Sequence, residues 1–527
     1  MNLLRGSIHG YDWERETRVF PACKPQSANR NCRSPRLTLT TVVLAALCGC
    51  TPARPPFRVS YWAAADGTDP IQAGAEVADA LFDRSAGRIQ LRAALDETVA
   101  FRLWVSYSGP TAGDVSVAVD DWQSGEATLA ADAVTIYRVH PVRVPRWPGW
   151  HLRSIEPDRR RELVEDVLVP SHAPRGGLPS RMSDGDTLAL WVDVHVPKGT
   201  RPGVFWSKLR MRCAGQTAAS VDLRLEVLSF VLPEPTEVVL AADVDQAALF
   251  AHHVTYLGRP CNTTRILRDS PVRAELQSVL DATLRLLHAH KVAPLLSTLY
   301  PIIKIDASNN LHVHWDDYDG AVEGYLDGTR FIDRVPLPLW VVPFDESFPP
   351  PPAYGAMQSP GYSRHLREYL AQCAEHFAER GWIERSFVEL PYAEFPGPEA
   401  FAASEHFARI TRKADARLRI LSNLFPQDLA PYGWPDFPTA DLLGYVDIWC
   451  PPAQFYAPPT PLDSVVSADS SVLSTQHSAL HEAWWMHVDR PPFSGSIELA
   501  ATAADARVLP WQAYREGTAV VRLGTIN

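Results

Sequence analysis

Eight short apolar runs, separated by longer segments with helical spacing, constrain the C-terminal part of this chain more than any other feature. Buried strands of this number, spread over about 290 residues, match the count and length of a (β/α)8 barrel. An open, doubly wound parallel sheet is the alternative. The runs are VVLAADV (238–244), APLLSTLYP (293–301), LPLWVVPF (337–344), SFVELPY (386–392), RILSNLF (419–425), VDIWCPP (446–452), AWWMHV (483–488) and AVVRLG (519–524).

Helical patterns between these runs support the alternation of strands and helices. Ser270 and Pro271 provide an N-cap and a proline at the first helical position of a helix over 271–291. Further strong helical patterns, over 363–380 and 398–415, precede the fourth and fifth runs, whereas the later helices are weakly marked. The first helix should bury the leucines that recur at helical spacing, which are Leu276, Leu280, Leu284 and Leu287.

The N-terminal half has a different rhythm, in which apolar and polar residues alternate with period two. Val192, Val194 and Val196, for example, alternate with Asp193 and His195. This pattern predicts an antiparallel β-sandwich over 57–235, followed by the barrel over 236–527. The alternating segments are 88–95, 99–107, 134–144, 190–197, 203–213 and 221–230.

The N-terminal segment has the parts of a secretory signal. Three arginines precede an apolar run over 37–47 that is too short to span a bilayer, and the run ends in Leu-Cys-Gly followed by Cys50. This ending resembles the lipobox of bacterial lipoproteins, which implies that Cys50 becomes the lipid-bearing first residue of the mature chain. We therefore expect a leader and signal peptide over 1–50, a proline-rich tether over 51–56, and an extracytoplasmic protein anchored in the cell membrane or outer membrane. An ordinary signal peptide or a cytosolic start is the alternative.

Charge and cysteine spacing exclude several classes of function. A net charge of −11 and a pI near 5.9 leave no basic footprint for nucleic acid. The chain has no GxSxG motif, no phosphate-binding loop and no GxGxxG before a helix. The close histidine pairs lack further ligands at metal-binding spacing, so we expect neither a metal nor a cofactor. The cysteines beyond Cys50 are widely spaced and indicate no zinc site or disulfide framework; they are Cys213, Cys261, Cys373 and Cys450.

A single glutamate is the first candidate for catalysis. Barrels of this kind place their chemistry at the C-terminal ends of the strands, and the fourth run continues as FVELPYAEFPGPEAF, with Glu394 just beyond the strand. This placement makes Glu394 a candidate general acid/base. The alternative is an ordinary solvated loop glutamate.

Several phrases, in this order and spacing, resemble the catalytic region of glycoside hydrolase family 123, also catalogued as domain of unknown function 4091. They are LWVDVHVPKGTRPGVFW, LRLEVLSFVLPEP, HAHKVAP, HFAERGWIERSFVELPYAEFPGPEAF and RVLPWQAYREGTAVV, and the resemblance extends over 57–527. It implies a sandwich followed by a (β/α)8 barrel. It also implies cleavage of a β-linked N-acetylhexosamine, typically N-acetylgalactosamine, from a glycan substrate.

The resemblance also implies a mechanism, from which this sequence departs at one position. In the family the fourth strand ends in Asp-Glu-Pro: the substrate's acetamido oxygen attacks the anomeric carbon, the Asp orients that group, and the Glu protonates the leaving oxygen. Glu394 matches the Glu, but Ala393 stands in place of the Asp, and Phe395 precedes the proline. Alanine supplies no charge or acceptor, so a large electrostatic contribution is missing from this position.

Three hypotheses account for Ala393. In the first, Asp345 or Glu346 after the third run supplies the missing carboxylate, because neighbouring strands lie about 4.8 Å apart; Glu389 is a poorer replacement, about 13 Å down an extended strand. In the second, Glu394 and Asp345 form an ordinary carboxylate pair acting on other sugars. In the third, the barrel is a noncatalytic carbohydrate-binding or structural envelope lipoprotein.

Aromatic residues at the strand ends are candidates for a sugar platform. Adjacent Trp484 and Trp485 must point to opposite sides of a strand, so at most one faces the site. For each aromatic residue, core packing is the alternative. The candidate substrate-binding residues are Tyr392, Trp449, Tyr456, Trp485 and His487.

Overall fold

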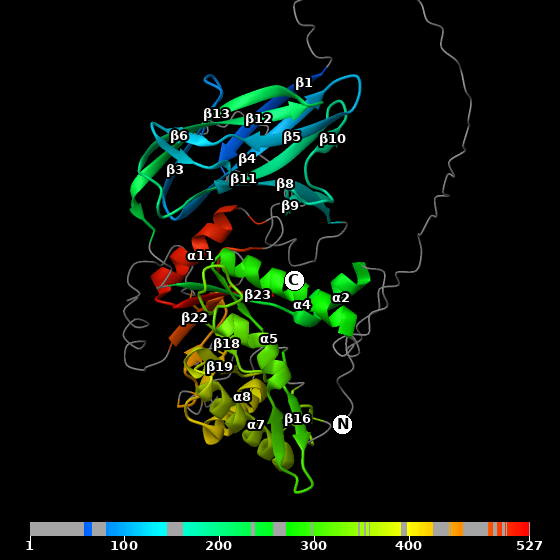
Figure 1. The fold of residues 1–527 in the computed structure, drawn as a ribbon. Helices are drawn as coiled ribbons and strands as arrows, with labels where there is room; N and C mark the ends of the chain where they lie inside the picture. The colour runs from blue at the N-terminus through cyan, green and yellow to red at the C-terminus, as the bar shows by residue number, and fades with distance from the viewer. Residues whose placement is uncertain are drawn as a thin grey trace, which may run out of the picture. The chain divides into compact units, whose positions relative to one another are not determined.

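The structure, a computed structural model, describes most of the chain beyond residue 56 (Figure 1). The predicted leader and tether lie outside the described residues, as do Cys50, Glu346, Tyr392 and Glu394. The described residues are 57–65, 81–144, 162–232, 238–256, 270–296, 299–345, 348–351, 355–357, 359–391, 398–424, 442, 444–456, 483–488, 493–497, 501 and 503–525.

The N-terminal part folds into two β-sheets with a common core. The first is antiparallel, in the order β1 (Arg58–Ala65), β4 (Glu97–Ser108), β11 (Thr187–Val196), β8 (Val134–Arg143) and β9 (Leu163–Pro170). The second has the order β10 (Ser180–Met182), β5 (Gly113–Val119), β12 (Gly203–Cys213), β13 (Gln216–Val231), β3 (Arg88–Leu95) and β2 (Phe82–Asp83), with β6 (Trp122–Ser124) and β7 (Ala127–Leu129) at its side.

The period-two pattern of the sequence is the cause of this two-sheet arrangement. Val192, Val194 and Val196 of β11 are buried in the same core as Leu223 and Leu225 of β13, from the other sheet. One feature differs from the antiparallel prediction: β13 pairs with β3 in parallel. These two strands are far apart in the sequence, so no hairpin imposes an antiparallel pairing on them.

The C-terminal part contains the eight predicted strands, of which six lie within their predicted runs and two, β15 and β23, extend one residue beyond theirs. Every hydrogen-bonded neighbour is parallel, and the order keeps the sequence order cyclically, as in a barrel rather than a doubly wound sheet. The order is β15 (Val292–Leu295), β14 (Val239–Asp243), β23 (Val520–Thr525), β22 (Ala483–His487), β21 (Ile448–Trp449), β20 (Arg419–Ser422), β19 (Ser386–Glu389) and β18 (Trp340–Val341).

The barrel is nearly closed, because its two outermost strands meet through side chains. Within the described residues β15 and β18 form no ladder with each other, but Leu295 and Val341 share the interior core. Beyond the strand ends, the Tyr300 hydroxyl donates a hydrogen bond to Asp345. The Tyr300 ring also stacks on Phe348, with 4.4 Å between ring centroids. Side-chain packing and one hydrogen bond therefore replace the missing ladder.

Helices cover the outside of the barrel. Their apolar faces and the outward side chains of the strands form one core, in which Leu276, Leu280 and Leu284 are buried as predicted. No helix in the described ranges is both long and apolar enough to cross a membrane. The α-helices are α2 (Gln246–Tyr256), α4 (Ser270–Ala289), α5 (Asp316–Leu326), α7 (Pro360–Glu379), α8 (Pro398–Ala414) and α11 (Ala503–Glu516), and the 3₁₀ turns are η2 (Ala131–Ala133), η4 (Ile383–Arg385) and η6 (Ala453–Phe455).

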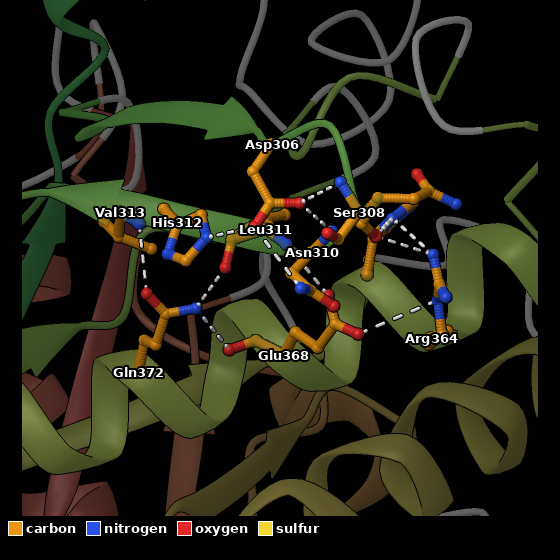
Figure 2. Close-up of polar contacts among 11 residues, drawn as sticks. Asp306, Ser308, Asn310, Leu311, His312, Val313, Arg364, Glu368 and Gln372 are labelled. Carbon is orange, nitrogen blue, oxygen red and sulfur yellow. Dashed lines mark hydrogen bonds and ion pairs between the residues drawn. The ribbon is translucent and has the colours of Figure 1, made fainter.

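A β-hairpin that the sequence pattern did not predict lies between β15 and α5. Its strands, β16 (Ile302–Ile305) and β17 (Leu311–His314), are antiparallel, and Figure 2 shows β17 bound to helix α7 by side chains. Gln372 accepts a hydrogen bond from the Val313 N–H at 3.0 Å and donates to the Leu311 carbonyl at 2.8 Å. Glu368 accepts from the Leu311 N–H at 3.1 Å. Glu368 and Gln372 are four residues apart, so they lie on one face of α7.

The turn of this hairpin is organised by Asp306 (Figure 2). Its carboxylate accepts hydrogen bonds from the backbone N–H groups of Asn310 and Ser308 at 2.9 and 2.8 Å. The His312 ring lies 3.0 Å from the same carboxylate. The Asn310 N–H and then His312 lower the pKa of Asp306 to about 2, since they stabilise its charged form. Arg364 of α7 donates to the Asn309 carbonyl at 2.8 Å, which joins the turn to the helix.

We expect Gln372→Ala to lower the free energy of unfolding by about 1–3 kcal/mol, because the backbone groups of Leu311 and Val313 lose their partners. Chemical denaturation measures the change. Glu375→Ala, on the exposed side of the same helix, is the control and should change stability by less than about 0.5 kcal/mol. Equal values for the two variants would contradict the anchoring role of Gln372.

Candidate functional site

The inward side chains of the barrel end in a charged layer at the C-terminal ends of the strands, a region termed the mouth below. Asp243, Glu389 and Arg522 each lie two positions beyond an interior apolar residue, so they point the same way as that residue. Enzymes with this architecture place their chemistry at this end. The interior apolar residues are Ala241, Ala293, Leu295, Leu339, Val341, Phe387, Leu421, Ile448, Cys450, Trp485 and Val520.

These three charged residues, termed the Arg522 triad, connect the last, first and fourth strands of the barrel. Arg522 donates to Asp243 from Nε at 2.9 Å and from Nη2 at 2.7 Å. It donates to Glu389 from Nη1 at 2.6 Å and from Nη2 at 3.1 Å. The side chains of Arg522, Asp243 and Glu389 are 9%, 24% and 16% exposed, so the carboxylates have more contact with solvent than the guanidinium.

Electrostatics within the triad favour the charged form of the arginine. Burial opposes the charge on Arg522, but the attraction of Glu389 and Asp243 outweighs it and holds the pKa of the guanidinium above its ordinary value. Two carboxylates and one guanidinium leave the triad with a formal charge of −1. Next to it, burial raises the pKa of the Cys450 thiol to about 12, which keeps this thiol neutral and unsuited to nucleophilic attack.

Asp345, predicted as a catalytic carboxylate, lies beyond β18 and is partly buried. It accepts the Tyr300 hydrogen bond that joins the loops after β15 and β18. Its backbone also exchanges hydrogen bonds with Phe348 at 3.1 and 3.2 Å. Burial and the nearby Asp345 charge both raise the pKa of Tyr362. Asp345 thus lies among aromatic residues, next to the two strands, β15 and β18, that form no ladder with each other in the described residues.

Trp485 and Trp484 point to opposite sides of β22, as predicted. Trp485 belongs to the interior core, where its ring meets Phe387 edge to face at 5.1 Å. Trp484 belongs to the outer core beneath the helices, near Trp449 at 6.3 Å. Trp485 is only 3% exposed, so it packs in the barrel interior and presents little ring surface to a ligand.

Trp449 and Tyr456, also predicted to bind substrate, lie in the outer core instead of the mouth. Ile448 and Cys450 occupy the inward positions on either side of Trp449, so the indole points outward. Trp449 is fully buried, and the buried Tyr456 hydroxyl donates to the Trp485 carbonyl at 2.7 Å. Burial on all sides favours packing over sugar stacking for both residues.

His487, another predicted ligand-binding residue, lies beside the triad on the neighbouring strand. It follows Trp485 by two positions on β22, which directs it inward, and it pairs in register with Arg522 on β23. The imidazole is partly buried. His487 therefore borders the charged layer.

Asp243 and Arg522 were not singled out from the sequence. The available signal was an arginine inside the apolar run AVVRLG, because a buried arginine requires an acidic partner. The sequence does not reveal which acidic residue that is. Among the described residues, no three or more His, Cys, Asp or Glu side chains are grouped so that they could hold a metal ion.

Comparisons with known proteins give a likeness of fold. No family model matches the sequence, and no curated protein matches it. The structure is similar to a family 123 glycoside hydrolase from Clostridium perfringens, described for glycolipid glycan hydrolysis, with a TM-score of 0.59 and 10% identity over 88% of this chain and 78% of that one. At this identity the likeness establishes a shared fold.

Two further solved structures are more distant. A family 5 xyloglucanase from Bacteroides ovatus has a TM-score of 0.24 and 7% identity over 84% of this chain and 92% of that one. A family 2 glycosyl hydrolase from Bacteroides cellulosilyticus has a TM-score of 0.28 and 8% identity over 82% and 44%. Neither value bears on the function of this chain.

We expect Arg522→Gln to lower the free energy of unfolding by about 3–5 kcal/mol, because it removes a buried charge that two partly buried carboxylates need as their partner. Arg417→Gln is the matched control: Arg417 pairs with Asp415 at the surface, where it is 54% exposed, and such pairs contribute about 0–1 kcal/mol. Denaturation followed by tryptophan fluorescence compares the two. A loss in Arg522→Gln as small as that of the control would be inconsistent with a structural role for the triad.

Proposed function

We propose that this protein is a glycoside hydrolase that cleaves terminal β-linked N-acetylhexosamine from glycans. Its scaffold is an N-terminal β-sandwich followed by a (β/α)8 barrel, and Glu394 is the general acid/base. The observation that carries the proposal is the charged layer at the mouth of an eight-stranded parallel barrel. The loop that contains Glu394 follows β19, whose last residue, Glu389, belongs to that layer.

Protonation of the leaving oxygen and stabilisation of positive charge at the anomeric carbon are the two tasks of such a site. Glu394 is assigned the first. For the second, Ala393 offers no carboxylate, so another acidic residue must contribute. Asp345 and Glu346, after the neighbouring strand, are the replacements that the sequence suggested. The partly buried Asp345, which already accepts a hydrogen bond from Tyr300, is the one that the structure describes.

A second candidate function is glycan binding without cleavage, or a structural role in the cell envelope. Ala393 favours it, because the family's carboxylate is absent from that position. The outward orientation of Trp449 and burial of Tyr456 also favour it, since they remove two aromatic residues from the predicted sugar platform. A hydrolysis assay separates the two functions.

Lipid anchoring belongs to the same proposal. The signal-like segment before Cys50 and the TPARPP segment after it support a lipoprotein whose folded part is tethered outside the cytoplasm. A lipid-anchored hydrolase would act on glycans at or near the cell envelope. Its partners would then be the membrane and a glycan substrate.

We expect the full-length protein in detergent to hydrolyse a chromogenic β-N-acetylgalactosaminide or β-N-acetylglucosaminide. Glu394→Gln should lower kcat by about 10²–10⁴-fold, because the variant cannot protonate the leaving group. Glu375→Gln, on the exposed side of α7, should retain full activity. Absorbance of the released chromophore measures both.

Failure of folded wild-type protein to hydrolyse either sugar would exclude the proposed activity and favour the glycan-binding alternative. Turnover that is unchanged in Glu394→Gln would leave the protein a hydrolase but transfer the acid role to another residue.

For the anchor, we expect wild-type protein expressed in a bacterial host to partition into the membrane fraction with lipid on Cys50, whereas Cys50→Ser does not. Mass spectrometry of the N-terminal peptide measures the modification. An intact leader and an unmodified Cys50 in the wild type would disprove the lipoprotein assignment.

A further inference from the structure

We propose that Glu389 is the carboxylate that stabilises positive charge at the anomeric carbon, and that Arg522 is its positioning residue. This inference rests on the proposed hydrolase function. Glu389 is the last residue of β19, it points inward two positions beyond the interior Phe387, and it borders the mouth. Its strand leads directly toward the segment that contains Glu394.

The hydrogen bonds within the triad determine what it can offer to a substrate. Four of the five N–H donors of Arg522 are engaged, one with each oxygen of the two carboxylates. A carboxylate oxygen that accepts one hydrogen bond still has a free lone pair. The triad therefore presents acceptors and a formal charge of −1 at the mouth, which suits hydroxyl donors and a developing positive charge rather than an anion.

The spacing of the carboxylates is also suitable for chemistry on a sugar ring. Both Asp243 and Glu389 bind Nη2 of Arg522, so the sum of the two bond lengths, 5.8 Å, is the upper limit of the separation between Asp243 Oδ1 and Glu389 Oε2. Two carboxylates this close together concentrate negative charge at the mouth, which suits stabilisation of a developing positive charge. Proton donation is assigned to Glu394.

The objection that Glu389 lies too far down its strand rests on an upper limit. A separation of about 13 Å from residue 393 holds for a fully extended chain between the two positions. Pairing with β20 continues one residue past β19, where the Leu390 N–H donates to the Leu421 carbonyl at 2.9 Å, and any bend after that point brings the two positions closer than this limit. Asp345, by contrast, is engaged with Tyr300 between the loops after β15 and β18, where it closes the barrel.

The test compares Glu389→Gln with Asp345→Asn in the full-length protein in detergent. We expect Glu389→Gln to lower kcat by about 10²–10³-fold, with KM within about threefold of wild type, because the carboxylate acts mainly in the transition state. Asp345→Asn tests the competing assignment and should lower kcat less than Glu389→Gln does, and Glu375→Gln, on the exposed side of α7, is the neutral control. Arg522→Lys should retain more kcat than Arg522→Gln, since lysine keeps the charge but not the forked geometry.

A binding measurement makes the inference independent of turnover. Titration calorimetry with a protonated iminosugar of N-acetylhexosamine configuration should give binding to wild type and at least tenfold weaker binding to Glu389→Gln. If Glu389→Gln does not fold, Glu389→Asp keeps the charge and should lower kcat at least tenfold, because the shorter side chain cannot both meet Arg522 and reach the substrate.

The outcomes separate the two proposals. Wild-type turnover with kcat unchanged in the folded Glu389 variant would overturn the role of Glu389 and leave the hydrolase function intact. Absence of turnover in wild type would exclude the hydrolase function, and absence of iminosugar binding would then exclude the anionic site as well. A kcat loss in Asp345→Asn that exceeds the loss in Glu389→Gln would transfer the role to Asp345.

Discussion

Burial of one arginine inside the barrel is the interaction on which the C-terminal part of the molecule depends. Arg522 lies on the last strand, and its partners Asp243 and Glu389 lie on the first and fourth strands. A buried guanidinium is tolerated only when its charge and donors are matched, so these three strands must keep their register relative to one another. β15 and β18, which lie between β14 and β19 in the barrel, form no ladder with each other in the described part of the chain, where side-chain packing and the Tyr300–Asp345 hydrogen bond join this part of the wall.

Packing of the barrel interior accounts for where the aromatic residues of the described strands lie. Small residues on β14 and β15, Ala241 and Ala293, share the interior with the large rings of Phe387 and Trp485. Large side chains thus fill the space left by small ones on other strands, as close packing of a barrel core requires. The remaining aromatic residues of the strands point outward and bury their area against the helices. The inward side chains at the C-terminal ends of the described strands are therefore mainly polar.

The sequence located the strands but not the side chains that meet at the described part of the mouth, for a physical reason. Apolar runs report burial, so all eight strands and helices such as α4 could be located. In a strand buried on both faces the run does not say which residues face inward, and the sequence therefore could not tell that Trp449 packs in the outer core. The partners of Arg522 lie on distant strands, and only the cyclic strand order brings them together. The hairpin on α7 depends on Glu368 and Gln372, whose contacts no local pattern reveals.

Stability and chemistry are coupled at the mouth, because the same ion pairs serve both. The triad joins three strands and keeps a formal charge of −1, although one carboxylate would be enough to neutralise Arg522. Desolvating a second carboxylate costs free energy, and a site kept at such a cost is more readily explained by ligand chemistry than by folding. Asp243 forms two hydrogen bonds with Arg522 at 2.7 and 2.9 Å, and Glu389 forms bonds of 2.6 and 3.1 Å. Asp243 is thus the more evenly bound partner and the more exposed one, at 24% against 16% for Glu389. What favours Glu389 for the catalytic role is its position at the strand end that leads to the Glu394 segment.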